Sequence, residues 1–571
     1  MSLPRRIATL LLALLLMLPG YVQAAESVGT TAQRQEDLNY LLDVIEKTHP
    51  NMYANTTKQA VADQKTYIEK HMEAWDDLTF AVELQTLVAL IQDSHTQLSI
   101  GDISREKLLP IGLQWMDGTW YLTGSTADKQ AYLGWEITAI NGKSMAEVQK
   151  ALSSMISADN AVKMRRSFSQ MVYTLKILTH FGVVEPDQGT VSISVRSGEG
   201  QSKDLTLTPM TREEIQKVEI SRIEDQRVSI PATEPVQQYY AWKDLGGGNF
   251  YIQYNTCAEA PELPMETFAA QVAEQLDRNQ YGRVIVDFRN NGGGSDGVVW
   301  PLFLELLKLQ QRGGELVALI SEATFSSAII NAVQMQQMGA ILVGEPTAGS
   351  VSHFGSVKRV ELPNSKLALG ISTKYIDLGE YYTAAKNVGV APLQPEAPAY
   401  QTLSDYLQGL DTAVNQAVAT PAPTLQQTAI ATPSLLPVKL NGKQSDLTGY
   451  LIGDEHYVAI RDLAAALQDT SAKFDVTWHG TEQVVELIPG QRYTAVGNEL
   501  APLPTGERSA SASPALLSQE QMPLQLFGQP GGLLVYRVDN RNYLRLRDLG
   551  NKLGFDVQWN QETSEVEIST K

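Results

Sequence analysis

Two neighbouring stretches decide the fold: RVIVDFRNNGGGSDG (283–297) and LISEATFSSAIINAVQMQQMGAILVGEPTAG (319–349). Each opens with a short apolar run typical of a buried strand and then reaches a polar turn. The first turn holds three consecutive glycines, which let the backbone bend sharply and expose its N–H groups. The second places Ser326 where a strand gives way to a helix, so that its hydroxyl feels the positive end of the helix dipole. The pair predicts a nucleophile beside a turn that can bind an oxyanion.

Each half of this pattern also has a purely structural interpretation. A triple glycine after a strand suits any anion-binding turn, and Ser326 could serve only as an N-cap. If the site is catalytic, the N–H of the residue after the nucleophile supplies a second donor beside the glycine loop. The predicted oxyanion-hole residues are Gly292, Gly293 and Ser327.

Strands and helices alternate between about residues 245 and 395. The runs NFYIQYN, RVIVDFR, LVALIS and AILVGE are short and rich in β-branched residues, as buried strands are. Helical patterns lie between them, over Phe268–Leu276, Val298–Leu307 and Ser326–Met338. This alternation predicts an α/β core.

These segments resemble the tail-specific, or C-terminal processing, serine peptidase superfamily in the motifs D-x-R-x-N-x-GG, T-x-S-[AS]-[AS] and GEPT-x-G. The resemblance covers about residues 33–398, implies a crotonase-like peptidase core and gives Ser326 as the nucleophile. One branch of the superfamily takes its base from a lysine directly after GEPT-x-G, but Ser350 stands at that position here. The branch that includes the tricorn core and the retinoid-binding protein repeats uses the histidine of a D-[GS]-H-T motif. Residues 93–96 read Asp-Ser-His-Thr, so the resemblance implies His95 as general base and Ser94 as a supporting residue.

Alternatives for the base and the third catalytic group stay open. His95 could instead cap the C-terminus of its helix, where a cation is favoured. His353 is a second candidate base, and Lys374 could also approach the site. In the tricorn-like core an acid precedes N-x-GV-x-P, but Lys386 holds that position in AAKNVGVAP. Glu380, six residues earlier, is therefore the candidate catalytic acid.

A chain of 571 residues predicts two to four domains. Basic residues, an apolar run and the small residues around Ala24 predict a signal peptide at the N-terminus. The expected divisions are a signal peptide (1–25), the N-terminal helical part of the peptidase domain (26–105), a PDZ-like module with a helical insertion (106–210), the α/β serine peptidase core (211–418), a Pro/Thr/Ala linker (419–436) and a C-terminal α+β repeat domain (437–571).

Two of these divisions rest on further resemblances. A predicted strand over 136–140, an Asn-Gly turn and a helix capped near Ser144 resemble the INGK segment of PDZ modules. Near the C-terminus, HYVAIRDLAAALQ with FDVTWHGTEQVVELI is echoed by NYLRLRDLGNKLG with FDVQWNQETSEVEIS. These two half-repeats resemble copper amine oxidase N-terminal-like, or stalk, repeats. Copper is not expected, because His456 and His479 have no counterparts in the second copy.

Composition and missing motifs argue against several classes of partner and cofactor. The net charge of -19 disfavours nucleic acid as a partner, and the single Cys257 excludes an intramolecular disulfide. The sequence has no Walker, dinucleotide-binding or H-E-x-x-H motif, so neither a cofactor nor a metal is expected. The expectation is a secreted serine endopeptidase that hydrolyses protein or peptide substrates through an acyl-enzyme and associates with the cell wall through its repeats. The alternative is a catalytically weak or inactive binding protein of the same fold on the cell surface.

Overall fold

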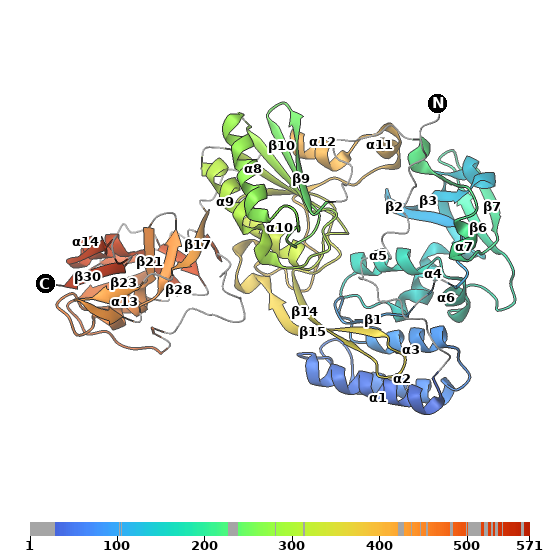
Figure 1. Ribbon diagram of the computed structural model, residues 1–571, viewed down its shortest axis with the longest axis horizontal. Coiled ribbons are helices and arrows are strands. Elements are labelled where there is room, and N and C mark those ends of the chain that lie inside the picture. The colour runs from blue at the N-terminus through green and yellow to red at the C-terminus, as the bar shows by residue number, and fades with distance from the viewer. Residues whose placement is uncertain are drawn as a thin grey trace.

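The computed structural model describes residues 29–101, 103, 105–226, 238–279, 281–311, 314–420 and, with gaps of which 501–514 is the longest, 428–570. The predicted signal peptide lies outside the described residues. Within these ranges, no helix is both long and apolar enough to cross a membrane. The prediction of a mixed α/β chain with several sheets is confirmed (Figure 1).

A six-stranded sheet in the order β16-β13-β12-β11-β10-β9 forms the centre of the chain (Figure 1). Its strands β10 to β13 are parallel, and β9 is an antiparallel edge. The elements, most of them predicted from the apolar pattern, are β9 (Tyr240–Gly246), β10 (Asn249–Tyr254), α8 (Met265–Arg278), β11 (Arg283–Asp287), α9 (Trp300–Gln311), β12 (Glu315–Ile320), α10 (Ser327–Gln337), β13 (Ile341–Gly344) and β16 (Ala397–Pro398).

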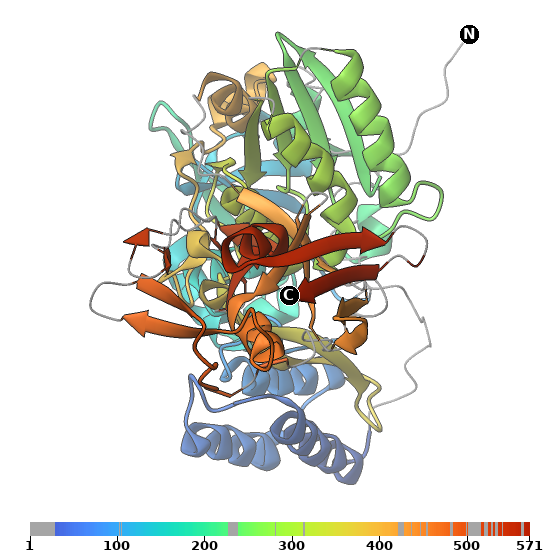
Figure 2. The same cartoon turned by 90° about the vertical axis from the view of Figure 1, so that its left-hand side faces the viewer.

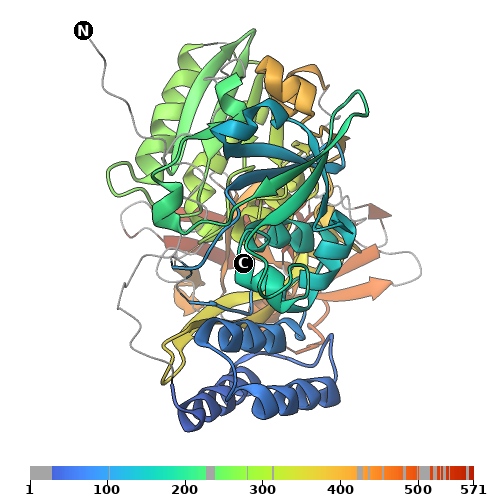
Figure 3. The same ribbon diagram turned by 90° about the vertical axis from the view of Figure 1, so that its right-hand side faces the viewer.

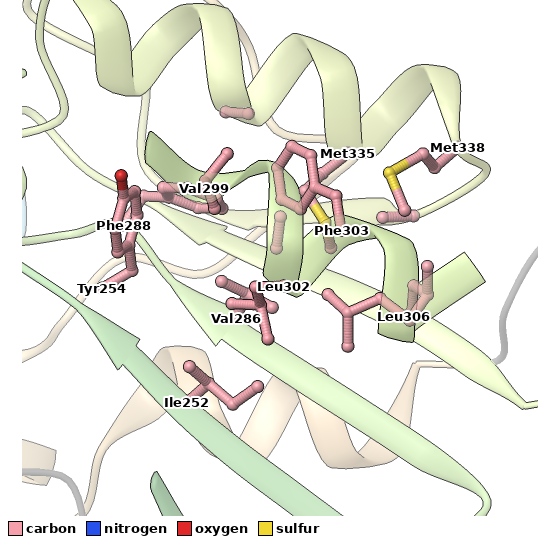
Figure 4. Close-up of a cluster of buried hydrophobic side chains, with 14 of the residues drawn as sticks. Ile252, Tyr254, Val286, Phe288, Val299, Leu302, Phe303, Leu306, Met335 and Met338 are labelled. Atoms are coloured by element: carbon pink, nitrogen blue, oxygen red, sulfur yellow. The ribbon is translucent and has the colours of Figure 1, made fainter. Parts of the chain in front are cut away.

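Both faces of this sheet are covered, which explains why its strands read as continuous apolar runs. Helices α8, α9 and α10 pack on one face, where Val286 and Phe288 of β11 and its end meet Phe303 and Leu306 of α9 (Figure 4). Helix α12 (Thr412–Ala419) covers the other face through Val414. The sheet is thus a rigid base whose strand ends present the loops of the site.

A long hairpin connects the central sheet to the N-terminal helices. Its strands are β14 (Ser352–Glu361) and β15 (Ala368–Asp377), and β15 also pairs with β1 (Gln97–Leu98). Figure 1 shows the hairpin running down to α1, α2 and α3. These helices, expected within residues 33–98, are α1 (Thr31–Thr48), α2 (Lys58–His71) and α3 (Asp77–Ala89). The hairpin therefore brings the loop after α3 to the edge of the central sheet.

The third part is a mainly antiparallel sheet, which lies in front of the central sheet in Figure 3. The predicted strand 136–140, the turn with positive φ at Asn141 and Gly142, and the capping box of Ser144 are confirmed. The predicted helical insertion is also present, mainly as α5. The elements are β2 (Ile111–Met116), β3 (Thr119–Thr126), β4 (Glu136–Ile140), α4 (Met145–Leu152), α5 (Ala161–Met171), α6 (Leu175–His180), β6 (Val191–Arg196) and β7 (Ser202–Leu207).

The C-terminal part contains the predicted internal repeat. Each copy is a strand, a short helix and a strand pair: β21 (Glu455–Ala459), α13 (Ile460–Leu467), β22 (Phe474–His479) and β23 (Val484–Pro489), then β28 (Arg541–Arg545), α14 (Leu546–Leu553), β29 (Phe555–Asn560) and β30 (Glu565–Thr570). Strands β21 and β28 pair within a closed barrel, β17-β20-β21-β28-β27-β24. This part faces the viewer in Figure 2.

The expected linker ends earlier than predicted. Residues Thr428–Ser434 form β17, which lies between β20 (Gly449–Ile452) and β24 (Ala515–Ser518) of the barrel. The composition of this segment indicated a linker because it has little apolar periodicity. Its hydrogen-bonding partners are distant in sequence, and pairing of that kind leaves no local signal.

The core packing gives a stability prediction. Replacing the fully buried Phe303 with alanine should lower the free energy of unfolding by about 3–5 kcal/mol, because it leaves a cavity in the α9 contact with β11. The neighbouring Leu304 is 40% exposed, so Leu304→Ala is the matched control and should change it by about 0.5 kcal/mol or less. Urea unfolding followed by tryptophan fluorescence measures both. Equal destabilisation by the two variants would contradict this packing.

Candidate active site

Ser326 lies in a strained turn between β12 and α10. Its φ of 54° and ψ of -130° belong to a backbone region that residues with a side chain rarely occupy. The residue precedes α10, but its side chain makes no capping hydrogen bond. Ser326 therefore occupies the N-cap position, as one interpretation predicted, but its hydroxyl does not cap the helix. Strain of this kind is characteristic of functional sites.

The glycine loop packs directly against this turn. An added Cβ on Gly293 would lie 2.7 Å from the Cβ of Ser326 and 2.9 Å from the carbonyl oxygen of Phe325. Gly293 also has a φ of 101°, so both space and conformation require glycine. Asn291 joins the two segments, because its carbonyl oxygen accepts the N–H of Phe325 at 3.0 Å. The nucleophile turn and the glycine loop thus form one unit.

The expected oxyanion donors differ in their availability. The N–H of Gly293 donates to Oδ1 of Asn291 at 2.9 Å, so it is already engaged, and its predicted role as a donor is not supported. Among the described residues, the N–H groups of Gly292 and Ser327 have no acceptor, and Ser327 stands at the first helical position, where none is expected. Ser327 Oγ donates to the carbonyl oxygen of Gly294 at 2.8 Å, which holds the helix start against the loop. The candidate donors are therefore Gly292 and Ser327.

The motif residues before the glycines have a structural role. The guanidinium of Arg289 binds the carboxylates of both Asp287 and Asp411 at 2.7–2.9 Å. Asp411 also caps α12. This ion-pair network fixes the end of β11 to the helix on the opposite face of the sheet, and so holds the start of the glycine loop.

His95 is held in place by the residue two positions before it. Asp93 is 1% exposed, and one of its oxygens accepts the backbone N–H of His95 at 2.9 Å. The other oxygen accepts from the hydroxyls of Thr96, at 2.5 Å, and of Ser372 on β15, at 2.6 Å, and it contacts Nε2 of His49 at 3.2 Å. Burial opposes ionisation of Asp93, but the hydrogen bonds from His49, Ser372 and Thr96 together lower its pKa.

The imidazole of His95 lies beside the nucleophile turn. Its ring stacks on Phe325, the residue before Ser326, with centroids 4.5 Å apart, and on His353 at 5.1 Å. Helix α3 ends at Ala89, and the buried ring nitrogens of His95 have no side-chain hydrogen-bond partner among the described residues. The helix C-cap interpretation is therefore wrong. Burial, and then repulsion from His353, lower the pKa of His95 to about 3, so the ring is neutral at neutral pH.

His353 and Lys374, the other candidates for the base, are less well placed than His95. His353 is buried, and its Nδ1 lies 2.8 Å from the carbonyl oxygen of Ser350, which fixes the ring against that of His95. Lys374 is exposed on β15. Among the described residues, His95 is the one candidate whose ring stacks on Phe325.

The structure does not bring the predicted acid to the base. Glu380 is exposed at the end of the short η6 helix (Leu378–Glu380), and no contact among the described residues joins it to His95. Lys386 is likewise exposed. Ser94 is buried beside His95, but its Oγ donates to Asp159 at 2.6 Å and not to the imidazole. Glu380 is therefore misplaced for a triad, because the loop that carries it turns toward solvent.

Helix α5 contributes residues that the sequence did not single out. Its N-cap, Asn160, donates to the carbonyl oxygen of Ala348 at 2.8 Å and to Oγ of Ser350 at 3.0 Å. Asp159 binds Ser94, and burial raises its pKa. Nζ of Lys163 lies 4.6 Å from the ring centroid of Phe325. In the sequence, an Asp-Asn pair before a helix indicates only an N-cap. The contact between this cap and the GEPT loop depends on the tertiary fold, so the sequence alone could not reveal it.

Cys257 has a structural role beside the glycine loop. Its Sγ contacts Asn291 and Asn331 at 3.4 Å, and burial raises the pKa of the thiol to about 12. Its N–H donates to the carbonyl oxygen of Gly293, so the residue supports the glycine loop. Within the described part of the chain, no group of histidine, cysteine or acidic side chains could hold a metal ion.

Comparison with known proteins gives only distant structural likenesses. No family model matches the chain, and no curated protein matches it either. Mature CPAF superposes with a TM-score of 0.46 at 13% identity, over 68% of this chain and 96% of that chain. The photosystem II D1 C-terminal processing protease gives 0.33 at 12%, over 64% and 92%. A lipoprotein from Streptococcus agalactiae gives 0.29 at 11%, over 68% and 99%.

The contact between the glycine loop and the nucleophile turn gives the next prediction. Gly293→Ala should abolish fluorophosphonate labelling of the protein, because the new methyl group displaces Ser326. Gly282→Ala is the control: that glycine precedes β11 and has open space around its Cβ position. Circular dichroism should show both variants folded. Labelling of Gly293→Ala at the wild-type rate would contradict the described packing.

Proposed function

We propose that this protein is a serine peptidase that cleaves peptide bonds through an acyl-enzyme, with Ser326 as nucleophile and His95 as general base. The observation that carries the proposal is the strained Ser326, which packs against the glycine loop and follows Phe325, the residue on whose ring the buried imidazole of His95 stacks. A strained nucleophile beside unpaired backbone N–H groups and a neutral base is the arrangement that acyl transfer needs.

The proposed reaction uses these groups in turn. His95 accepts the proton of Ser326 Oγ as the oxygen attacks the scissile carbonyl carbon. The N–H groups of Gly292 and Ser327 stabilise the negative charge that develops on the carbonyl oxygen. His95 then gives its proton to the leaving amine, and a water molecule, activated by the same imidazole, hydrolyses the acyl-enzyme. Asp93 accepts a hydrogen bond from the backbone N–H of His95 and none from its ring, so it is a positioning residue.

One observation favours the second candidate, a weak or inactive binding protein of the same fold. No carboxylate bonds to the imidazole of His95 among the described residues, so the group that usually orients and stabilises the charged ring is missing. A serine–histidine pair can act without it, but more slowly. The free enzyme is therefore expected to have a low turnover number.

We further propose that the peptidase is exported and acts on proteins or peptides outside the cell. The apolar segment near the N-terminus supports export, and the strongly acidic composition suits a soluble protein in an open environment. The C-terminal repeats would hold it at the cell wall. Association of the full chain, but not of residues 29–420, with cell-wall fragments would support this role.

Variants of Ser326 and His95 test the proposed nucleophile and the proposed base. Ser326→Ala should lower kcat/KM for a fluorogenic peptide by about ten-thousandfold and remove fluorophosphonate labelling; His95→Ala should lower both by about a thousandfold. Ser295→Ala, an exposed position on the same glycine loop, is the control and should stay within about threefold of the wild type. Unlabelled wild-type protein would favour the binding-protein alternative. Full labelling of His95→Ala would exclude His95 as the base.

The pH dependence tests the state of the base. The lowered pKa of His95, about 3, means that the imidazole stays unprotonated as the pH falls below its ordinary value of 6.5. The acidic limb of kcat/KM should therefore lie below about pH 5, because activity is lost only when His95 becomes protonated. A limb centred near pH 6.5 would show that an ordinary imidazole titrates and would contradict the described environment.

A further inference from the structure

Helix α5 carries two cations, Lys163 and Arg166, that have no ion-pair partner among the described residues. Lys163 and Arg166 are both half-buried and lie one turn apart on the same side of the helix. Lys163 packs over the ring of Phe325, next to the nucleophile. Among the described residues, neither side chain forms an ion pair. We call Lys163 and Arg166 the α5 cation pair.

The carboxylates around this pair are committed elsewhere. Asp159 is bonded by Ser94, and Asp93 is held by the hydroxyls and the backbone N–H described above. Glu322, on the nucleophile turn, binds the guanidinium of Arg165 at 3.2 Å. None of these carboxylates forms an ion pair with the α5 cation pair, although the charges of Asp159 and Asp93 act on Lys163 and that of Glu322 acts on Arg166.

Two half-buried like charges on one side of a helix repel each other, and here neither has a direct ion pair to offset the repulsion. Burial and the charge of Arg166 lower the pKa of Lys163 to about 8, and burial lowers the pKa of Arg166. At neutral pH the pair is still charged. An anion that enters the site would gain the attraction of both groups and relieve their repulsion.

We propose that the α5 cation pair binds a carboxylate of the peptide substrate close to the scissile bond, so that the site selects acidic peptides. This inference rests on the proposed peptidase site, because Lys163 packs over Phe325, the residue before Ser326, and Arg166 follows one turn later on α5. The carboxylate belongs to a glutamate or aspartate side chain or to the chain terminus. Either one presents the same planar anion to an ammonium and a guanidinium group.

Binding to Ser326→Ala tests the inference without requiring activity. Fluorescence anisotropy would compare amidated peptides that contain Glu or Gln, and a neutral peptide with a free or an amidated C-terminus. We expect at least one acidic member of these pairs to bind about tenfold or more tightly than its neutral partner. The Glu/Gln pair reports on side chains, and the acid/amide pair reports on the terminus.

Substitutions in the α5 cation pair test whether these two residues cause the preference for acidic peptides. Lys163→Met and Arg166→Met, each in the Ser326→Ala background, should weaken binding of the acidic peptide about tenfold and leave the neutral peptide within about twofold. Lys163→Arg should keep the preference, which separates loss of charge from misfolding. Arg278→Met, at an exposed position on α8, removes one charge far from this helix face and serves as the control.

Equal affinity for acidic and neutral peptides would overturn the inference, and so would an equal loss for both in Lys163→Met. These outcomes are separate from failure of the proposed function. An inactive wild type whose Ser326→Ala variant still prefers acidic peptides would be a carboxylate-selective binding protein. An active wild type without that preference would be a peptidase in which the α5 cation pair has no part in selection.

Discussion

The buried carboxylate of Asp93 is the contact on which the site depends. Its oxygens join the end of α1 through His49, strand β15 through Ser372 and the backbone of His95. Burying a carboxylate is expensive unless charge-assisted hydrogen bonds replace its water, and here several donors do so. Three segments far apart in sequence are thereby fixed around one charge, and the imidazole of His95 is placed at the edge of the central sheet.

The rest of the site is built from the strand ends of that sheet. Parallel strands β11 and β12 end side by side, so the loops after them, one with three glycines and one with Ser326, must meet. Their contact is close enough to require glycine at position 293. Helix α5 closes the arrangement from the neighbouring sheet, through Asn160 and the GEPT loop. The base, the nucleophile and the cations thus come from three parts of the chain that are distant in sequence.

Because the site is assembled from segments distant in sequence, only the parts with local signals could be predicted from the sequence. Apolar runs and turn residues predicted β10 to β13, their helices and Ser326 with its glycine loop, because those signals are local. His95 was accessible only through a family motif. The placement of Glu380 was wrong, and Asp159 and Lys163 were missed, because their positions depend on how α5 and the loop after β15 pack. The barrel that includes β17 was missed for the same reason, since its strands pair across long separations.

A crystal structure of the full chain treated with a small fluorophosphonate would test the central claim most directly. The account predicts an adduct on Ser326 Oγ, with its phosphoryl oxygen within hydrogen-bonding distance of the N–H groups of Gly292 and Ser327. The imidazole of His95 should face the adduct and remain stacked on Phe325. An adduct on another residue, or one on Ser326 with His95 turned away and Asp93 released from Ser372, would contradict it.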